Sequence, residues 1–185
     1  MFYAGLDPGK RLDYSALAVV EGAQPEGREL AVRYLERIEL GTPYTDVVRR
    51  TAELMARLGR CRLVVDATGV GMPVVDMLRG AKPALDMTAV MITSGAEQRL
   101  SDGVWHVPKV DLLAGVQAAL EAGELRIARG MKETGTLVRE LTDVRARVRG
   151  RGRLRLGADG RGQHDDLVVA VALACWAARK ESPRG

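Results

Sequence analysis

Acidic residues stand at the ends of apolar segments in three widely separated parts of the chain. Asp7 and Asp66 each end an apolar run, and Asp165 and Asp166 precede a third one. Ligands of open α/β sheets bind at strand ends, so these carboxylates would share one crevice if their strands are neighbours. Clustered carboxylates repel one another and need cations between them. Hard oxygen ligands favour Mg²⁺ or Mn²⁺, and two such ions about 4 Å apart would bind the attacking water and the leaving oxygen of a phosphodiester.

Each acidic residue also has a purely structural explanation. Asp7 lies in Asp-Pro-Gly, a favourable turn sequence, and Asp165 or Asp166 is a favourable N-cap for the helix that follows. Asp66 is harder to explain in this way because it directly follows a strand of the buried type, and the glycines of segment 68–71 leave room for the backbone to approach a ligand. Three acidic positions at three distant element ends form a more specific pattern than any one of them.

Short apolar runs and amphipathic stretches alternate along the chain and indicate which elements position these carboxylates. Three strands come first, and helices and strands then alternate, as is typical of parallel strands joined by crossovers. The predicted strands are 2–6, 16–20, 30–40, 61–65, 88–92 and 125–128, and the predicted helices are 45–58, 70–79, 110–122, 133–144 and an amphipathic helix at 165–180. We therefore expect an α/β fold with a mixed central sheet, three antiparallel strands followed by parallel strands, and helices on both faces.

Length and composition favour a single domain spanning residues 1–185. The chain has 185 residues, 46% of them hydrophobic, which is enough for a core without disulfides or structural metal. Cys61 and Cys175 lie in apolar runs with no partner at ligand spacing, which predicts two reduced core residues. No apolar stretch is long enough to cross a bilayer and none resembles a leader, so we expect a soluble protein that is not exported.

Positive charge is concentrated in one segment, because residues 126–155 contain ten basic and three acidic side chains while the whole chain has a net charge of +4. A β-hairpin over 145–156, turning near Gly150 and Gly152, would line alternate arginines along one face of each strand, where they would contact DNA phosphates. A solvated basic edge strand is the alternative. No aromatic residue interleaves with them, so contacts to the DNA backbone are expected rather than base stacking. The alternating arginines are Arg145, Arg147, Arg149, Arg151, Arg153 and Arg155.

Two glycine-containing segments resemble nucleotide-binding motifs only superficially. Three residues separate Gly5 from Gly9, and Arg11 stands where a P-loop has a Ser or Thr for Mg²⁺. Segment 69–71 opens a helix as in a dinucleotide-binding loop, but the third glycine position is Val74. A sugar-kinase-like ATPase begins with a similar strand, yet it needs a second domain that this length does not supply. These patterns argue against nucleotide binding.

Three segments together resemble the nuclease domain of viral large terminases, over residues 2–178. The segments are Gly5-Leu6-Asp7-Pro8-Gly9 followed by Asp13-Tyr14-Ser15-Ala16, then Val64-Val65-Asp66-Ala67-Thr68-Gly69-Val70-Gly71, and then His164-Asp165-Asp166 leading into Ala170, Ala172 and Ala174. The resemblance implies a ribonuclease H-like fold and two-metal hydrolysis that cuts concatemeric viral DNA during genome packaging.

The resemblance also implies which carboxylates bind metal and catalyse. Asp7 and Asp66 match two of them, with Asp7 bridging two Mg²⁺ or Mn²⁺ ions and Asp66 holding one. The third is Asp166 or Asp165, and Asp166 is favoured because Holliday-junction resolvases of the same superfamily also place an Asp ahead of an Ala-rich run. Many relatives have a further Asp where this chain has Val169. Both members of the acidic pair are therefore retained as ligands.

Two further residues are candidate accessory groups. His164 precedes the acidic pair and would orient water or substrate, although a lone His at a helix start is as often structural. Lys109 begins a predicted helix at a position where similar proteins often have a lysine. It would contact a phosphate, although a solvated lysine at a helix start is the commoner case.

The partners follow from the same resemblance. Double-stranded DNA is the expected substrate, and the packaging-motor ATPase domain and the portal are the expected protein partners, in the host cell cytoplasm and away from membranes. The isolated domain is expected to be monomeric. A Holliday-junction-resolvase-like nuclease and a catalytically inactive DNA-binding module of the same fold are the alternatives.

Overall fold

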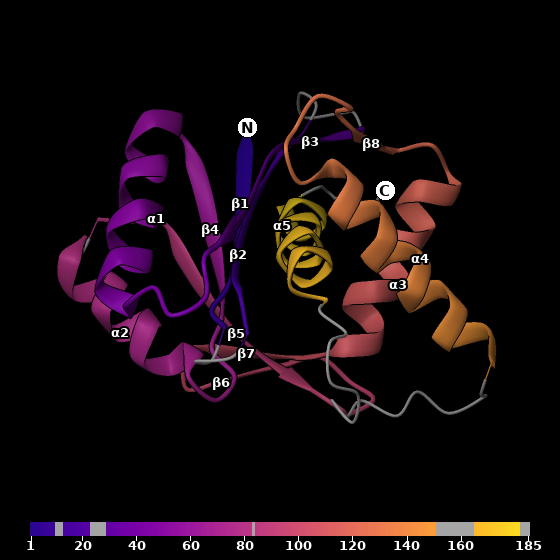
Figure 1. Cartoon of the computed structure of the whole chain (residues 1–185). Helices are drawn as coiled ribbons and strands as arrows, with labels where there is room; N and C mark the ends of the chain where they lie inside the picture. The colour runs from indigo at the N-terminus through magenta and orange to yellow at the C-terminus, as the bar shows by residue number, and fades with distance from the viewer. Residues whose placement is uncertain (10–12, 23–28, 83, 151–164, 182–185) are drawn as a thin grey trace.

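The central feature of the computed structural model is one mixed sheet. The structure describes residues 1–9, 13–22, 29–82, 84–150 and 165–181. At 145–150 it describes the backbone alone. Within the described residues, eight strands and five helices are present (Figure 1). The strands are β1 (Phe2–Asp7), β2 (Ser15–Gly22), β3 (Leu30–Ile38), β4 (Cys61–Asp66), β5 (Met87–Thr93), β6 (Arg99–Ser101), β7 (Val104–Pro108) and β8 (Leu125–Ile127). The helices are α1 (Tyr44–Leu58), α2 (Gly71–Ala81), α3 (Lys109–Glu121), α4 (Thr134–Gly150) and α5 (Asp166–Glu181).

The sheet starts as an antiparallel meander and continues with parallel strands. β1 pairs antiparallel with β2, and β2 pairs antiparallel with β3. On the other side of β1, the strands β4, β5 and β7 follow in parallel. The strand order is β6-β7-β5-β4-β1-β2-β3-β8. The expected mixed α/β architecture, with three antiparallel strands followed by parallel ones, is confirmed.

Helices cover both faces of this sheet, as predicted. Figure 1 shows α1 and α2 on one face, and α5 on the other face with α3 and α4 outside it. The core is accordingly split into two clusters, one centred on α1 and α2 and the other on α5. One face of α1 packs on the first cluster, because Val47, Val48 and Met55 are buried there. Both faces of the sheet are therefore covered by helices, as its apolar strands require.

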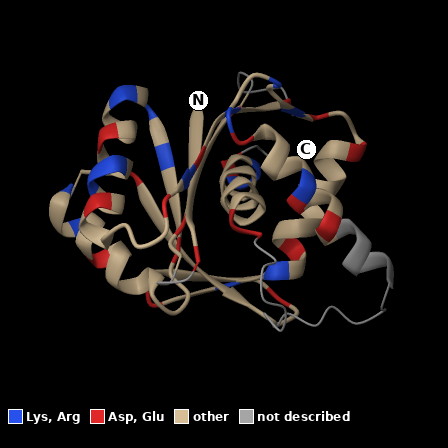
Figure 2. Cartoon of the chain, viewed as in Figure 1, with Lys and Arg blue, Asp and Glu red and all other residues tan. Residues whose placement is uncertain are grey.

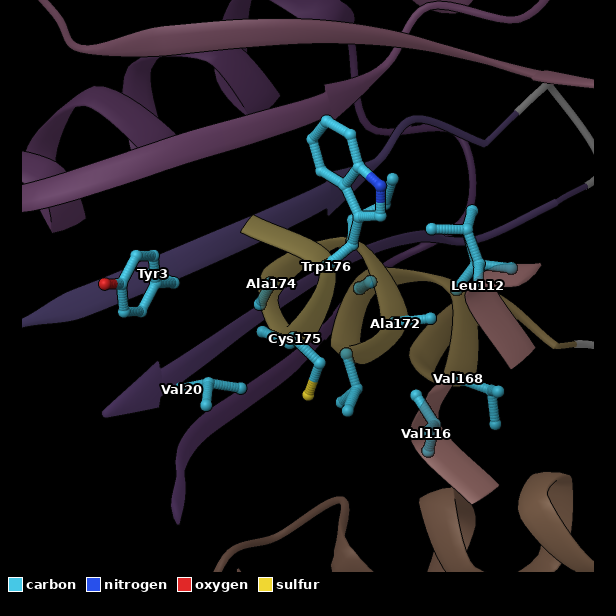
Figure 3. Close-up of a cluster of buried hydrophobic side chains, with 14 of the residues drawn as sticks. Tyr3, Val20, Leu112, Val116, Val168, Ala172, Ala174, Cys175 and Trp176 are labelled. Atoms are coloured by element: carbon cyan, nitrogen blue, oxygen red, sulfur yellow. The ribbon is translucent and has the colours of Figure 1, made fainter. Parts of the chain in front are cut away.

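Helix α5 is the innermost helix, and its environment differs from the prediction. Residues 166–178 are all buried, so the helix is enclosed on every side rather than amphipathic. Small side chains allow this close packing, and a Cβ at Gly5 of β1 would lie only 1.9 Å from the carbonyl oxygen of Ala170. Figure 3 shows Ala172 and Ala174 on α5 among the larger side chains of the same cluster. The alanine-rich sequence thus brings α5 against the central strand of the sheet.

Strands β6 and β7 form a hairpin that the sequence analysis did not predict. Its turn has Asp102 at φ 52° and Gly103 at φ 76°, a left-handed pair that favours Asp-Gly. This dipeptide was a visible hairpin signal, but the strand before it is only three residues long. The predicted helix at 110–122 is confirmed as α3, which begins directly after β7.

Helix α4 is longer than predicted, and this corrects the proposed basic hairpin. The prediction ended the helix at residue 144 and made 145–156 extended, whereas α4 continues to Gly150. Arginine and alanine are strong helix formers, and their propensity outweighs the alternating pattern in this segment. A spacing of two residues, which aligns side chains on a strand, does not align them on a helix. The prediction of a strand at 145–150, the first half of the expected hairpin, is wrong. Residues 151–156, its second half, lie outside the described residues.

The two cysteines lie in the core, as expected. Cys61 and Cys175 are both buried, and they belong to the clusters on opposite faces of the sheet. The prediction that they are core residues is confirmed. Among the described segments, no helix has the length and apolar character needed to span a membrane.

Candidate active site

Asp7 and Asp66 end two neighbouring parallel strands on the same face of the sheet. β1 and β4 pair with Leu6 level with Val65, so the two aspartates follow at the same height. Neighbouring strands lie about 4.8 Å apart. Leu6 and Val65 face the cluster beneath α1 and α2, and successive side chains alternate between faces. Both aspartates therefore point toward the α5 face, as their positions at strand ends predicted.

A network of hydrogen bonds fixes the turn that carries Asp66. Its Oδ1 accepts the backbone N–H of Thr68 at 2.8 Å, and the hydroxyl of Thr68 accepts the N–H of Ile92 at 2.9 Å. Burial raises the pKa of Asp66 above its ordinary value, while the hydrogen bonds from Thr68 and the positive charge of Lys109 act in the opposite direction. The end of β4 is thereby tied to the end of β5.

The glycines after Asp66 serve the turn itself rather than the approach of a ligand. A Cβ at Gly71 would lie 1.8 Å from the carbonyl oxygen of Asp66. Gly69 has φ 60°, a left-handed conformation that L side chains rarely adopt. The sequence analysis expected Gly71 to leave space for a ligand, and the structure corrects this, because the protein's own backbone occupies that space.

The turn that follows Asp7 is held equally firmly. The N–H of Gly9 donates to the hydroxyl of Ser15 at 3.0 Å, and the hydroxyl of Tyr44 donates to the carbonyl oxygen of Gly9 at 3.0 Å. A Cβ at Gly9 would lie 2.3 Å from the carbonyl oxygen of Tyr14, so a larger residue does not fit. The Asp-Pro-Gly turn signal is thus compatible with a second role for Asp7, whose side chain takes no part in these bonds.

The acidic pair stands at the start of α5, at the same end of the sheet. Asp165 directly precedes the helix, and Asp166 is its first residue and is buried. Lys109, the first residue of α3, donates to Oδ2 of Asp165 at 2.6 Å. Figure 2 shows the acidic start of α5 and the basic start of α3 near the ends of the central strands. The helix therefore adds its carboxylates to the face occupied by Asp7 and Asp66.

The pKa of Asp7 is influenced by the other three carboxylates and by Lys109. Burial raises the pKa of Asp7 well above its ordinary value, and this is the largest cause. The negative charges of Asp66, Asp166 and Asp165 raise it further. The positive charge of Lys109 lowers it. The four predicted carboxylates thus act on one another electrostatically, and the positive charge of Lys109 offsets part of their negative charge.

The donor set has the chemistry that a hard divalent cation requires, namely several carboxylate oxygens and no sulfur. Within the described ranges, however, no group of three or more His, Cys, Asp or Glu side chains is arranged to hold a metal ion. Basic side chains pair with the acids instead. Lys109 lies 2.6 Å from Asp165, and Arg37 lies 3.5 Å from Asp166. A cation that binds here would have to displace these ion pairs.

The sequence analysis missed two residues beside the acidic pair, namely Arg37, which lies 3.5 Å from Asp166, and Glu140, which accepts hydrogen bonds from the backbone of the next residues of α5. Arg37 lies opposite Ala16, which lies opposite Asp7, so the three residues form a row across β3, β2 and β1 on the α5 face. Glu140 of α4 accepts a hydrogen bond from Arg37 at 2.6 Å. The alternation of side chains along β3 would have placed Arg37 on the same face as Asp7, but only with the strand register known. No sequence signal distinguishes Glu140 from the other polar residues of its helix.

The side chains of the remaining predicted residues are not among those that the structure describes. The backbone of three arginines lies in the last part of α4, and their side chains are not described. His164 and the other three arginines lie outside the described residues. The arginines placed in α4 are Arg145, Arg147 and Arg149, and those outside are Arg151, Arg153 and Arg155.

The fold is similar to that of solved nuclease domains. The large terminase nuclease from the thermophilic phage G20c has 26% identity to this chain, with a TM-score of 0.62 over 94% of this chain and 80% of that one. The nuclease domain of the large terminase subunit of bacterial virus Sf6 has 16% identity and a TM-score of 0.61, over 94% and 87%. The human cytomegalovirus terminase nuclease domain has 12% identity and a TM-score of 0.53, over 95% and 82%. No protein-family model and no curated protein sequence matches the chain significantly.

The fold is therefore that of the ribonuclease H-like nucleases, with the mixed sheet and flanking helices seen in those neighbours. Within this class, the solved structures that the chain resembles are the nuclease domains of large terminases, from phages and from cytomegalovirus. The likeness to this group, which the sequence motifs predicted, is confirmed.

Proposed function

We propose that the chain is a metal-dependent endonuclease that hydrolyses phosphodiester bonds of double-stranded DNA. The observation that carries the proposal is that Asp7 and Asp66, at the ends of two neighbouring parallel strands, share their electrostatic environment with Asp165 and Asp166 at the start of α5. Neighbouring terminase nucleases have been solved with bound zinc, cobalt and manganese, which supports a role for divalent cations here. Mg²⁺ or Mn²⁺ is the proposed cofactor, with two ions bound.

We propose a role for each carboxylate that its place in the fold supports. The charges of Asp66, Asp166 and Asp165 all act on Asp7, so Asp7 is the carboxylate that would be shared between two ions. Asp66 would hold one ion, and Asp166 or Asp165 would hold the other. Two bound cations supply the activation of water and the stabilisation of the leaving oxygen in phosphodiester hydrolysis. The hydrogen-bonded turns after β1 and β4 keep Asp7 and Asp66 in position for this work.

DNA contacts are proposed for Lys109 and for the basic residues at the end of α4. Lys109, once separated from Asp165, would present its ammonium group to a phosphate next to the scissile bond. The arginine-rich end of α4 and the segment that follows would contact phosphates along the duplex. Contacts of this kind fix the position of the duplex and are independent of its sequence, which suits a nuclease that cuts concatemers.

The biological role is proposed from the likeness to large terminases. The chain would cut concatemeric viral DNA during genome packaging, in the host cell cytoplasm. Its partners would be a packaging-motor ATPase domain and the portal. The isolated domain would be a monomer. These assignments depend on the nuclease activity and are tested after it.

Cleavage of supercoiled plasmid by the purified chain is the decisive experiment. The reaction is compared with Mg²⁺, with Mn²⁺ and with EDTA, and beside the variant Asp66→Asn. This variant keeps an oxygen that accepts the N–H of Thr68, so the turn is preserved while the charge is lost. Asp76→Asn, at an exposed position of α2, is the matched control. Metal-dependent cutting that is lost in Asp66→Asn and kept in Asp76→Asn is the expected result.

The alternatives give different results in the same assay. An inactive DNA-binding module would bind DNA in a salt-sensitive manner without cutting it, whichever cation is present. The pairing of Lys109 and Arg37 with the acidic residues is the observation that favours this alternative. A resolvase-like nuclease would cut a four-way junction in preference to linear duplex of the same sequence.

A further inference from the structure

Arg37 is the positive centre of a half-buried ionic network beside the acidic pair. Its Nη2 donates to Oε1 of Glu140 at 2.6 Å and lies 3.5 Å from Oδ2 of Asp166. Its guanidinium carbon lies 4.5 Å from the centre of the Tyr14 ring, which adds a cation–π contact. Arg37 is therefore shared between two carboxylates, with the shorter contact to Glu140.

Glu140 connects this arginine to the helix that carries the acidic pair. It is 5% exposed. Its Oε2 accepts the backbone N–H groups of Leu167 at 3.0 Å and Val168 at 3.1 Å. These N–H groups belong to the first turn of α5, where no helical carbonyl is available to them. Glu140 thus caps α5 from a different helix while its other oxygen holds Arg37.

The charges of this network decide what Asp166 can bind. If Glu140 carried no charge, Arg37 would interact most strongly with Asp166 and would repel a cation that approached the same carboxylate. With Glu140 ionised, the arginine is already neutralised by a partner at 2.6 Å. Asp166 then contributes its negative charge to the cluster around Asp7.

We propose that Glu140 is a positioning residue that neutralises Arg37 and so leaves Asp166 able to bind a divalent cation. The inference rests on the proposed nuclease function and identifies how the metal affinity of that site is set. Glu140 touches neither cation nor substrate. It acts through Arg37 and through the position of α5.

The test is a double-mutant cycle on cation affinity, measured by electron paramagnetic resonance of free Mn²⁺. The variants are Glu140→Gln, Arg37→Gln and the double variant. The amide oxygen of Gln still accepts hydrogen bonds from α5, so the cap is kept while the charge is removed. The titration is made at about pH 8, because burial raises the pKa of Glu140 to about 7 and the carboxylate must be ionised. Thermal melting shows that each variant is folded.

The expected results differ in direction between the variants. Glu140→Gln should weaken Mn²⁺ binding about tenfold, because Arg37 is then left to pair with Asp166. The double variant should recover an affinity close to that of the wild-type chain. Asp143→Asn, an exposed charge loss on the same helix, should leave the affinity within about twofold. If Glu140→Gln does not fold, Arg37→Gln alone provides the test, because it should bind Mn²⁺ at least as tightly as the wild-type chain.

Two kinds of failure are distinguishable. Wild-type affinity in Glu140→Gln, with a lowered melting temperature, would show that Glu140 is only a structural cap and would overturn this inference while leaving the nuclease intact. Weak binding in the double variant or in Arg37→Gln would overturn it as well. A wild-type chain that binds no Mn²⁺ would overturn the proposed function together with this inference.

Discussion

Lys109 and Asp165 join the start of α3 to the start of α5 through an ion pair of 2.6 Å. The same ammonium group lowers the pKa values of Asp7 and Asp66, against the burial that raises them. Lys109 therefore acts as an internal counter-charge for the carboxylates of the candidate active site. Its removal should change how protons and cations compete for these carboxylates.

Lys109→Met should shift the pH dependence of cleavage to higher pH by about one unit, because Asp7 and Asp66 then lose protons less readily. Cation binding requires the deprotonated carboxylates, so the rise of activity with pH reports this competition. The measurement is the initial rate of plasmid cleavage at saturating Mg²⁺ as a function of pH. Lys82→Met, at an exposed position after α2, should keep the wild-type profile. An unchanged profile in Lys109→Met would contradict the counter-charge role.

The metal-free chain should become less stable as the pH rises. Asp7, Asp66 and Glu140 all have pKa values raised in the folded state, chiefly by burial. A carboxyl group with a raised pKa stabilises the fold fully below its unfolded pKa, and this contribution is lost as the pH rises through the folded pKa. For Glu140 this window extends from 4.5 to about 7.

Melting temperatures at about pH 5 and pH 8, with and without Mn²⁺, test this linkage. Without a cation the chain should melt lower at the higher pH, and Mn²⁺ should offset the loss mainly at that pH. In Asp66→Asn both the pH dependence and the effect of Mn²⁺ should be reduced. Stability that is constant or increases with pH in the metal-free chain would show that these carboxylates do not control it.

Gly5→Ala should damage both the fold and the proposed activity. The added Cβ would lie 1.9 Å from the carbonyl oxygen of Ala170, so α5 must move away from β1. We expect a loss of roughly 3 kcal/mol in the free energy of unfolding, and slower cleavage because Asp166 moves away from Asp7. Gly80→Ala is the matched control, since no atom lies within 4 Å of the added Cβ. That helical substitution should stabilise the chain by about 0.5–1 kcal/mol. Equal effects of the two substitutions on urea unfolding would contradict the close packing.

Replacing the three arginines at the C-terminal end of α4 by glutamine should weaken DNA binding and its salt dependence. Each lost phosphate contact should lower the slope of log affinity against log salt by about 0.9. Glutamine is a good helix former, so α4 itself should be preserved. The measurement is duplex binding by fluorescence anisotropy at several salt concentrations, and unaltered slopes would exclude these arginines from the interface. The test set is Arg145, Arg147 and Arg149, and the control set on α1 is Arg49, Arg50 and Arg57.

Much of the fold was predictable because its elements have strong local patterns. The apolar run before Asp66 and the helical stripe of α1 need no tertiary information to be recognised. The meander is similarly marked by the turn after Asp7. The hairpin of β6 and β7 was missed although Asp102-Gly103 signals it, because the short first strand offers no alternating pattern.

The basic segment shows where local pattern is misleading. Alternating arginines fit a strand, but the same residues have high helix propensity, and α4 includes Arg145 and Arg149. Periodicity alone does not decide between two such structures in so short a segment, because the intervening Ala146 and Val148 fit either one. Glu140 escaped prediction for a related reason, since its partners Arg37 and Leu167 are far away in the chain.

The sequence by itself determined the types of most elements and the acidic residues at their ends, because both depend on neighbours a few positions apart. Only the tertiary structure decided that Asp7 and Asp66 are level on adjacent strands and that α5 lies against Gly5. It also decided that Arg37 of β3 lies beside Asp166 and is paired with Glu140 of α4. Strand register and helix packing depend on contacts between distant segments, and these form only when the two faces of the sheet are buried together.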